Sequence, residues 1–193
     1  DDTNPYTPKV SCYNLDGNVV KLTMTNNPNG FALTSLKSTY PMSVISVVKT
    51  GAKNDSLEVN RYNWMNPEVV EIYGNLKAAK PINIPISSMR RYFIHNVEKA
   101  LEDNKINISN TLYASKIVPD DAVLITEITN PIKRTVAPIL QNSNNLMAES
   151  LFKLASASKY SATGTDILGE EVFKDFYNKF GLETENILVK DGC

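Results

Sequence analysis

The sequence has few of the residues that most often bind metals or cross-link a chain. Its 193 residues include one histidine, His95, and two cysteines, Cys12 and Cys193. Two cysteines alone do not make a tetrahedral zinc site. A single histidine excludes a histidine-rich metal centre, so we expect no metal. It also excludes a catalytic triad whose histidine lies at any position other than His95. A disulfide-stapled scaffold is also excluded, while a bridge between Cys12 and Cys193, near the two chain ends, is left open.

An excess of one charge and long apolar runs are missing as well. The chain has 20 basic and 21 acidic residues, a net charge of −1. Proteins that bind nucleic acids or anionic membranes carry a basic excess, so neither partner is expected. No run of about eighteen apolar residues predicts a membrane span, and no basic segment followed by an apolar stretch indicates a signal peptide. Because 42% of the residues are apolar, the chain can bury a core, in one large domain or two small ones.

The first eighty residues have the pattern of a β-rich unit. Apolar and polar residues alternate over residues 18–25, as in a half-buried strand, and a strong turn signal follows at residues 26–30. Turn residues then separate short apolar stretches at about ten-residue spacing, which is typical of all-β units. Further strands are predicted at residues 31–36, 44–49, 56–62 and 68–73.

The period changes after Pro85. Apolar residues then recur every four positions from Met89 to Leu101 behind a serine cap, which predicts a helix over residues 88–103. His95 lies on the flank of that stripe, where we expect a surface or structural role. Further elements are predicted as a buried strand at 122–127, a short helix after Asn130-Pro131, a helix through Leu146, Leu151 and Leu154, a helix at 165–180 ended by Gly181, and a strand at 187–190. The fold class is therefore α+β.

Short patterns typical of penicillin-recognising enzymes occur at unsuitable places. Lys49-Thr50-Gly51 matches K-T-G, and S-x-x-K is matched by Ser46/Lys49, Ser150/Lys153 and Ser156/Lys159. The nucleophilic serine of S-x-x-K needs a helix start, so that serine and lysine share one face a turn apart. Ser46 lies in a strand pattern, and the other two serines lie inside or at the end of a predicted helix. We interpret all four matches as accidental.

A polar segment, residues 142–145, precedes one of the predicted helices. Serine and asparagine are preferred helix caps, so one interpretation is purely structural. The wider string Ser143-Asn144-Asn145-Leu146-Met147-Ala148-Glu149-Ser150-Leu151 resembles the S-x-N-L-x-A-E-x-L segment of the class C low-molecular-mass penicillin-binding proteins. These are the D-alanyl-D-alanine carboxypeptidases and endopeptidases of serine peptidase family S13.

Other stretches resemble the same family in the same order. Residues 6–15 are similar to its Y-x-x-P-V-S-x-L segment, residues 74–82 to G-x-(I/L)-P-x-x-x-P, residues 89–106 to its helix and the following G-I-x-V, residues 125–139 to S-P-P-L-x-x-I, and residues 188–192 to V-D-G-S-G-L. Lys9, Cys12 and Cys193 depart from these patterns. The resemblance covers most of the chain, and the S-N-N-L-x-A-E string is its specific part.

The resemblance implies an internal part of a serine peptidase. In such enzymes the S-x-x-K serine precedes the inserted domains and K-T-G follows the D-G-S-G turn, so the chain would hold one active-site motif of three and be inactive alone. The implied organisation is a lead-in segment (1–12), a β-rich inserted accessory domain (13–80), a returning helical segment (81–115) and part of a serine β-lactamase/transpeptidase-like penicillin-binding domain (116–193).

The implied activity is cleavage of peptidoglycan stem peptides at D-Ala-D-Ala through an acyl-serine, in the periplasm or cell envelope and without a cofactor. Ser143 would relay a proton, and Asn145 would hold the catalytic lysine and the peptide carbonyl of the substrate. β-lactams would bind the intact parent protein. The alternative is a non-catalytic extracytoplasmic binding or scaffolding module, in which residues 142–145 are only a helix cap.

Overall fold

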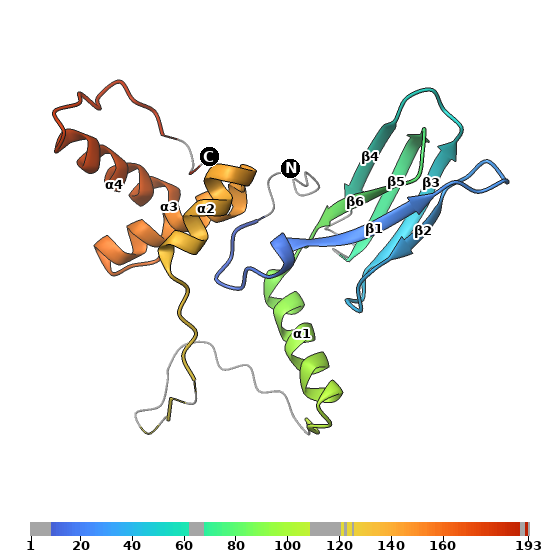
Figure 1. Ribbon diagram of the computed structural model, residues 1–193, viewed down its shortest axis with the longest axis horizontal. Helices are drawn as coiled ribbons and strands as arrows, with labels where there is room; N and C mark the ends of the chain where they lie inside the picture. The colour runs from blue at the N-terminus through green and yellow to red at the C-terminus, as the bar shows by residue number, and fades with distance from the viewer. Residues whose placement is uncertain are drawn as a thin grey trace. The chain divides into compact units, whose positions relative to one another are not determined.

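A computed structural model of the chain describes residues 9–61, 68–108, 121, 123–124, 126–189 and 192. The chain divides into two compact units, residues 1–97 and 98–193 (Figure 1). The strands of the described residues are β1 (Val19–Thr25), β2 (Leu33–Leu36), β3 (Ser43–Thr50), β4 (Ser56–Arg61), β5 (Val69–Leu76) and β6 (Lys80–Pro85). The helices are α1 (Met89–Asp103), α2 (Ile132–Asn142), α3 (Asn145–Tyr160) and α4 (Asp166–Asn178).

The first unit contains two three-stranded sheets. In one, β1 is central and antiparallel to both β2 and β6. In the other, β5 is central, parallel to β3 and antiparallel to β4. Sheets and helices occur together, so the predicted α+β class is confirmed.

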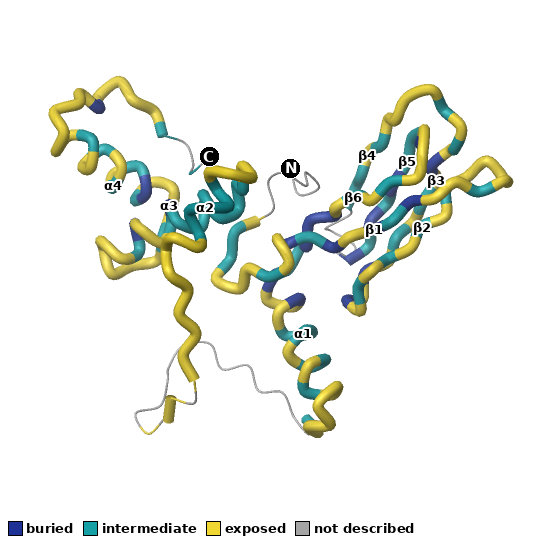
Figure 2. Tube along the Cα trace, viewed as in Figure 1, coloured by how far each residue is buried: buried dark blue, intermediate teal, exposed yellow. Residues whose placement is uncertain are grey.

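Both sheets and the start of α1 contribute to one hydrophobic core. Alternation along β1 places Val20, Leu22 and Met24 on its buried face. Figure 2 shows the buried positions recurring along the strands of this unit. The other members of the core are Tyr40, Met42, Val48, Val70, Ile72, Leu76, Ile84, Ile86, Met89 and Tyr92. The β-rich unit therefore contains its own apolar interior.

Polar side chains tie the segment before β1 to this unit. The side-chain amide of Asn18, 1% exposed, donates to the Lys9 carbonyl at 2.8 Å and accepts from the Leu15 N–H at 3.0 Å. The Tyr92 hydroxyl donates to Asp16 at 2.6 Å. Because these polar groups are paired, their removal from water is compensated.

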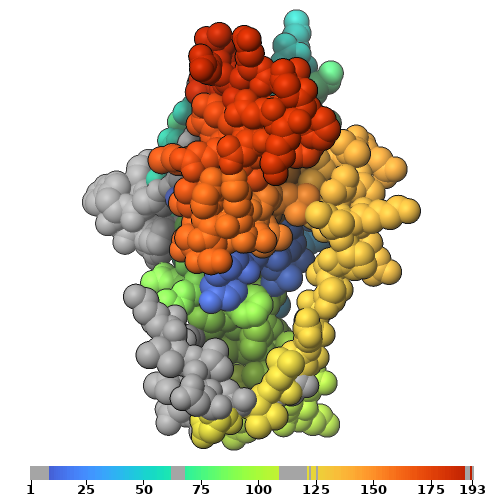
Figure 3. Space-filling model, turned by 90° about the vertical axis from the view of Figure 1, so that its left-hand side faces the viewer, coloured from blue at the N-terminus to red at the C-terminus, as the bar shows by residue number. Residues whose placement is uncertain are grey.

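The second unit is helical in the part that the structure describes. α3 packs against both α2 and α4, and α3 and α4 lie side by side, orange and red, in the space-filling view (Figure 3). Phe152 of α3 is the only buried hydrophobic side chain among the described residues of this unit. Gly169 of α4 allows this contact, because a Cβ there would lie 2.5 Å from the Phe152 ring.

Most predicted elements are present, one strand was missed, and two predicted strands are absent from the described residues. β1 to β5, α1, α2, α3 and α4 lie where the periodicity placed them, and Gly181 has the left-handed φ of 74° expected after a helix. β6 was missed because Pro81 and Pro85 suggested a break, yet proline is tolerated on an edge strand such as β6.

The strand predicted at 122–127 is absent from the described residues of that stretch, and Val123 and Leu124 are 83% and 76% exposed. The strand predicted at 187–190 is also absent over residues 187–189. Neither stretch pairs with a neighbouring strand in the described part of the chain, so its backbone groups have no ladder to join. The domain boundaries proposed from the sequence stay a prediction.

Candidate active site

The S-x-N motif forms the tight connection between α2 and α3. Ser143 follows the last residue of α2 in the left-handed conformation, with φ 51° and ψ 50°. Asn144 then takes an extended conformation, and Asn145 is the first residue of α3. The chain thus reverses within two residues. Ser143 is exposed and Asn145 is partly buried.

Capping of α3 is performed by Asn144. Its side-chain oxygen accepts a hydrogen bond from the Met147 N–H at 3.0 Å, the usual geometry of an N-cap. The structural interpretation of the segment is therefore correct for Asn144. Ser143 is the C-cap of α2 through its backbone conformation, but the N-cap hydrogen bond of α3 uses neither the Ser143 hydroxyl nor the Asn145 amide, the two candidate catalytic groups.

A network of ion pairs begins on α3 one turn after the S-x-N motif. Glu149, four residues after Asn145, binds the Lys153 ammonium at 2.8 Å, and Lys153 also binds Asp166 of α4 at 3.1 Å. The second oxygen of Glu149 accepts a hydrogen bond from the Gly192 N–H at 2.8 Å. Sequence reasoning did not single out this network, although the i,i+4 spacing of Glu149 and Lys153 was a visible signal.

The network holds Lys153 in its charged form. Partial burial acts to lower the pKa of Lys153, but the hydrogen bonds to Glu149 and Asp166 outweigh it and raise the pKa above the ordinary lysine value. Glu149 and Lys153 together hold the pKa of Asp166 below its ordinary value. A raised pKa disfavours the neutral amine that a proton acceptor needs.

The geometry of the other S-x-x-K matches agrees with an accidental origin. Ser150 donates to the Leu146 carbonyl at 2.6 Å, and Ser156, fully buried, donates to the Lys153 carbonyl at 2.8 Å. Ser46 and Lys49 lie three positions apart in β3, so their side chains project from opposite faces of the sheet. Ser150 and Ser156 lie inside α3 and not at its start, and both hydroxyls donate to backbone carbonyls.

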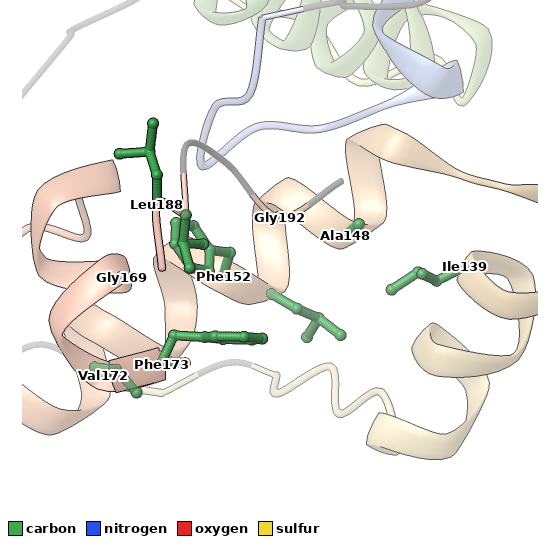
Figure 4. A pocket seen from close by; sticks show the side chains of 11 residues that line it. Ile139, Ala148, Phe152, Gly169, Val172, Phe173, Leu188 and Gly192 are labelled. Carbon is green, nitrogen blue, oxygen red and sulfur yellow. The ribbon is translucent and has the colours of Figure 1, made fainter. Parts of the chain in front are cut away.

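An apolar groove of about 850 Å³ lies along α3 (Figure 4). Its walls include Ile139, Leu151, Phe152, Val172, Phe173 and Leu188. Among the described residues that line it, none has a charged or hydroxyl side chain, so these residues offer a packing surface.

The remaining candidates have structural or surface positions. His95 Nε2 lies 3.1 Å from the Thr39 hydroxyl, and its ring stands edge-on to Tyr40, which agrees with the expected structural role. Cys12 is exposed, whereas Cys193 lies outside the described residues. Over the described ranges no cluster of three possible metal ligands occurs, and none of the helices there is long and apolar enough to cross a bilayer.

Several solved chains share this fold. Penicillin binding protein 4 (dacB) from Haemophilus influenzae, complexed with a novel β-lactam, superposes with a TM-score of 0.76 at 18% identity, over 93% of this chain and 43% of that one. A second structure of the same protein gives a TM-score of 0.76 at 17% identity, over 98% and 43%. The chain thus spans less than half the length of these structures.

Comparison with protein families gives the assignment. No curated protein sequence matches the chain. The family described as the D-Ala-D-Ala carboxypeptidase 3 (S13) family, however, has a model that matches residues 1–193. The resemblance inferred from the S-N-N-L-x-A-E string is therefore confirmed, and the chain belongs to the S13 family.

Proposed function

We propose that this chain is part of a longer serine-type D-Ala-D-Ala carboxypeptidase or endopeptidase that trims peptidoglycan stem peptides. The observation that carries the proposal is the Ser143-Asn144-Asn145 connection. Asn144 supplies the side chain that caps α3 through Met147, and Ser143 ends α2 through its backbone conformation, so the N-cap of α3 uses neither the Ser143 hydroxyl nor the Asn145 amide. The chain belongs to the S13 family, and the Ser143 hydroxyl and Asn145 amide are groups that can take part in acyl transfer.

The proposed reaction passes through an acyl-serine. A serine hydroxyl from sequence outside these 193 residues attacks the carbonyl carbon of the penultimate D-Ala; a C–O bond forms, and the C–N bond to the terminal D-Ala breaks. The serine proton passes to the leaving amine, and Ser143 is suited to relay it because a hydroxyl both accepts and donates. The Asn145 amide is suited to donate to the peptide carbonyl of the substrate and to accept from the catalytic lysine. Water then hydrolyses the ester.

Three successive parts of the chain have different proposed roles. Residues 13–80 form an accessory domain without a catalytic group, residues 81–115 return the chain, and residues 116–193 belong to the penicillin-binding domain. The reaction needs no cofactor. Its substrate lies in the cell wall, so we place the protein in the periplasm or cell envelope, with β-lactams as further ligands of the full-length protein.

Labelling with a fluorescent penicillin tests the proposal. The full-length protein should become covalently labelled and should release D-Ala from a stem pentapeptide. The 193-residue chain alone should stay unlabelled, because Ser46 lies in a strand, and Ser150 and Ser156 lie inside α3 with hydroxyls that donate to backbone carbonyls. A stoichiometric label on one of these serines would contradict the assignment of the nucleophile. A full-length protein that is neither labelled nor active would favour the non-catalytic module.

A further inference from the structure

The backbone at Gly192 is pressed against the start of α3. A Cβ at this position would lie 2.6 Å from the Ala148 carbonyl oxygen and 2.9 Å from the Glu149 nitrogen, so only glycine fits without a shift. Figure 4 shows Gly192 beside this helix, near Ala148. Two segments that are 43 residues apart in the sequence therefore meet within the first five residues of α3.

The Glu149 carboxylate stabilises this contact. Glu149 Oε2 accepts from the Gly192 N–H at 2.8 Å, while Oε1 binds the Lys153 ammonium at 2.8 Å. Lys153 in turn binds Asp166 on α4 at 3.1 Å. The Glu149 side chain is only 15% exposed, so water does not readily replace the Gly192 N–H as its partner. Both carboxylate oxygens of Glu149 therefore have a partner.

The position of Glu149 links this contact to the candidate active site. Residues four apart lie on one face of a helix, so Glu149 stands one turn after Asn145 on the same face of α3. We propose that Glu149 is a positioning residue for the acyl transfer proposed above: its carboxylate fixes the backbone at Gly192 relative to Ser143 and Asn145. This inference rests on the proposed function.

Two matched double variants of the full-length protein separate the hydrogen bond from the ion pair. Lys153→Met is common to both, so both lose the ion pair. Glu149→Gln keeps an acceptor for the Gly192 N–H, whereas Glu149→Leu has a similar size and no acceptor. The rate of acylation by fluorescent penicillin is measured together with amide exchange at Gly192. We expect the Leu variant to react about 10- to 100-fold more slowly than the Gln variant and to exchange Gly192 faster.

Gly192→Ala perturbs the same contact without touching Glu149. Its Cβ displaces the backbone from Ala148, so a similar loss of acylation rate is expected even if the Leu variant does not fold. Equal acylation rates in the Gln and Leu variants, or a wild-type rate in Gly192→Ala, would overturn the inference. An unlabelled wild-type protein would instead refute the proposed function, so the two failures are distinguishable.

Discussion

The connection between α2 and α3 allows stability and catalysis to be changed separately. Ser143 has φ 51° and ψ 50°, a conformation that costs a residue with a Cβ about 1 to 2 kcal/mol. Ser143→Gly removes that cost but adds roughly 0.5 to 1 kcal/mol of chain entropy in the unfolded state. The free energy of unfolding should therefore stay equal or rise by about 1 kcal/mol, although the hydroxyl is lost.

Asn144→Ala should have the opposite effect. It removes the side-chain oxygen that accepts from the Met147 N–H at 3.0 Å. Loss of an N-cap typically lowers the free energy of unfolding by about 1 kcal/mol. Both candidate catalytic residues, Ser143 and Asn145, stay in place, so this variant is the matched control for a purely structural effect.

The acylation rate should depend on whether a candidate catalytic group is removed, and not on how much the variant is destabilised. We expect Ser143→Gly to lower the acylation rate by about 10²- to 10⁴-fold, as for a lost proton relay, and Asn145→Ala by about 10²- to 10³-fold, as for a lost polar contact to the reacting group. Asn144→Ala should stay within a factor of a few. The assay is penicillin acylation and D-Ala release by the full-length protein, with melting curves on the same samples. If Ser143→Gly reacts at the wild-type rate, or if Asn144→Ala is the slowest variant, the catalytic assignment is wrong.

Three further outcomes follow from the first unit. Lys49 is exposed on β3, so Lys49→Ala should leave acylation by the full-length protein unchanged; a large loss would show that the K-T-G match is functional. Asn18→Ala removes buried hydrogen bonds to Lys9 and Leu15 and should lower the free energy of unfolding by about 2 to 3 kcal/mol in urea titrations; an unchanged midpoint would contradict this. Burial and the hydrogen bond to Asp16 raise the pKa of Tyr92 from 10.0 to about 12, so the folded state binds this proton more tightly than the unfolded state. The resulting stabilisation is complete below about pH 10 and is lost towards pH 12, and Tyr92→Phe should flatten this fall in the melting temperature.

The strands and helices with a clear period could be predicted from the sequence. Alternation over residues 18–25 and the four-residue recurrence from Met89 gave β1 and α1 nearly to the residue. The apolar stretch at 122–127 has the pattern of a buried strand. A strand also needs a neighbouring strand that pairs with its backbone groups, and the local sequence does not show whether one is present. The reverse error occurred at β6, whose pairing with β1 outweighs its two prolines.

The sequence string proposes Ser143 and Asn145 as site residues, and that assignment stays a prediction. The local geometry could not be predicted, because three adjacent polar residues all suit a cap. Only the backbone angles assign that role to Asn144. The contact between Glu149 and Gly192 joins residues that are 43 positions apart in the sequence. Local periodicity does not predict a contact between residues so far apart.

Apolar periodicity predicts which face of a helix is buried, but not what covers it. In the first unit, the alternating residues of β1 meet a core formed within the described residues. In the second unit, Phe176 and Phe180 of the predicted apolar face are 54% and 69% exposed, and the groove along α3 is open. Exposed apolar side chains beside an open apolar groove are typical of interaction sites. The surroundings of α3 influence how much each side chain contributes to stability, so the effects of Ser143, Asn144 and Glu149 substitutions on stability are to be measured in the full-length protein.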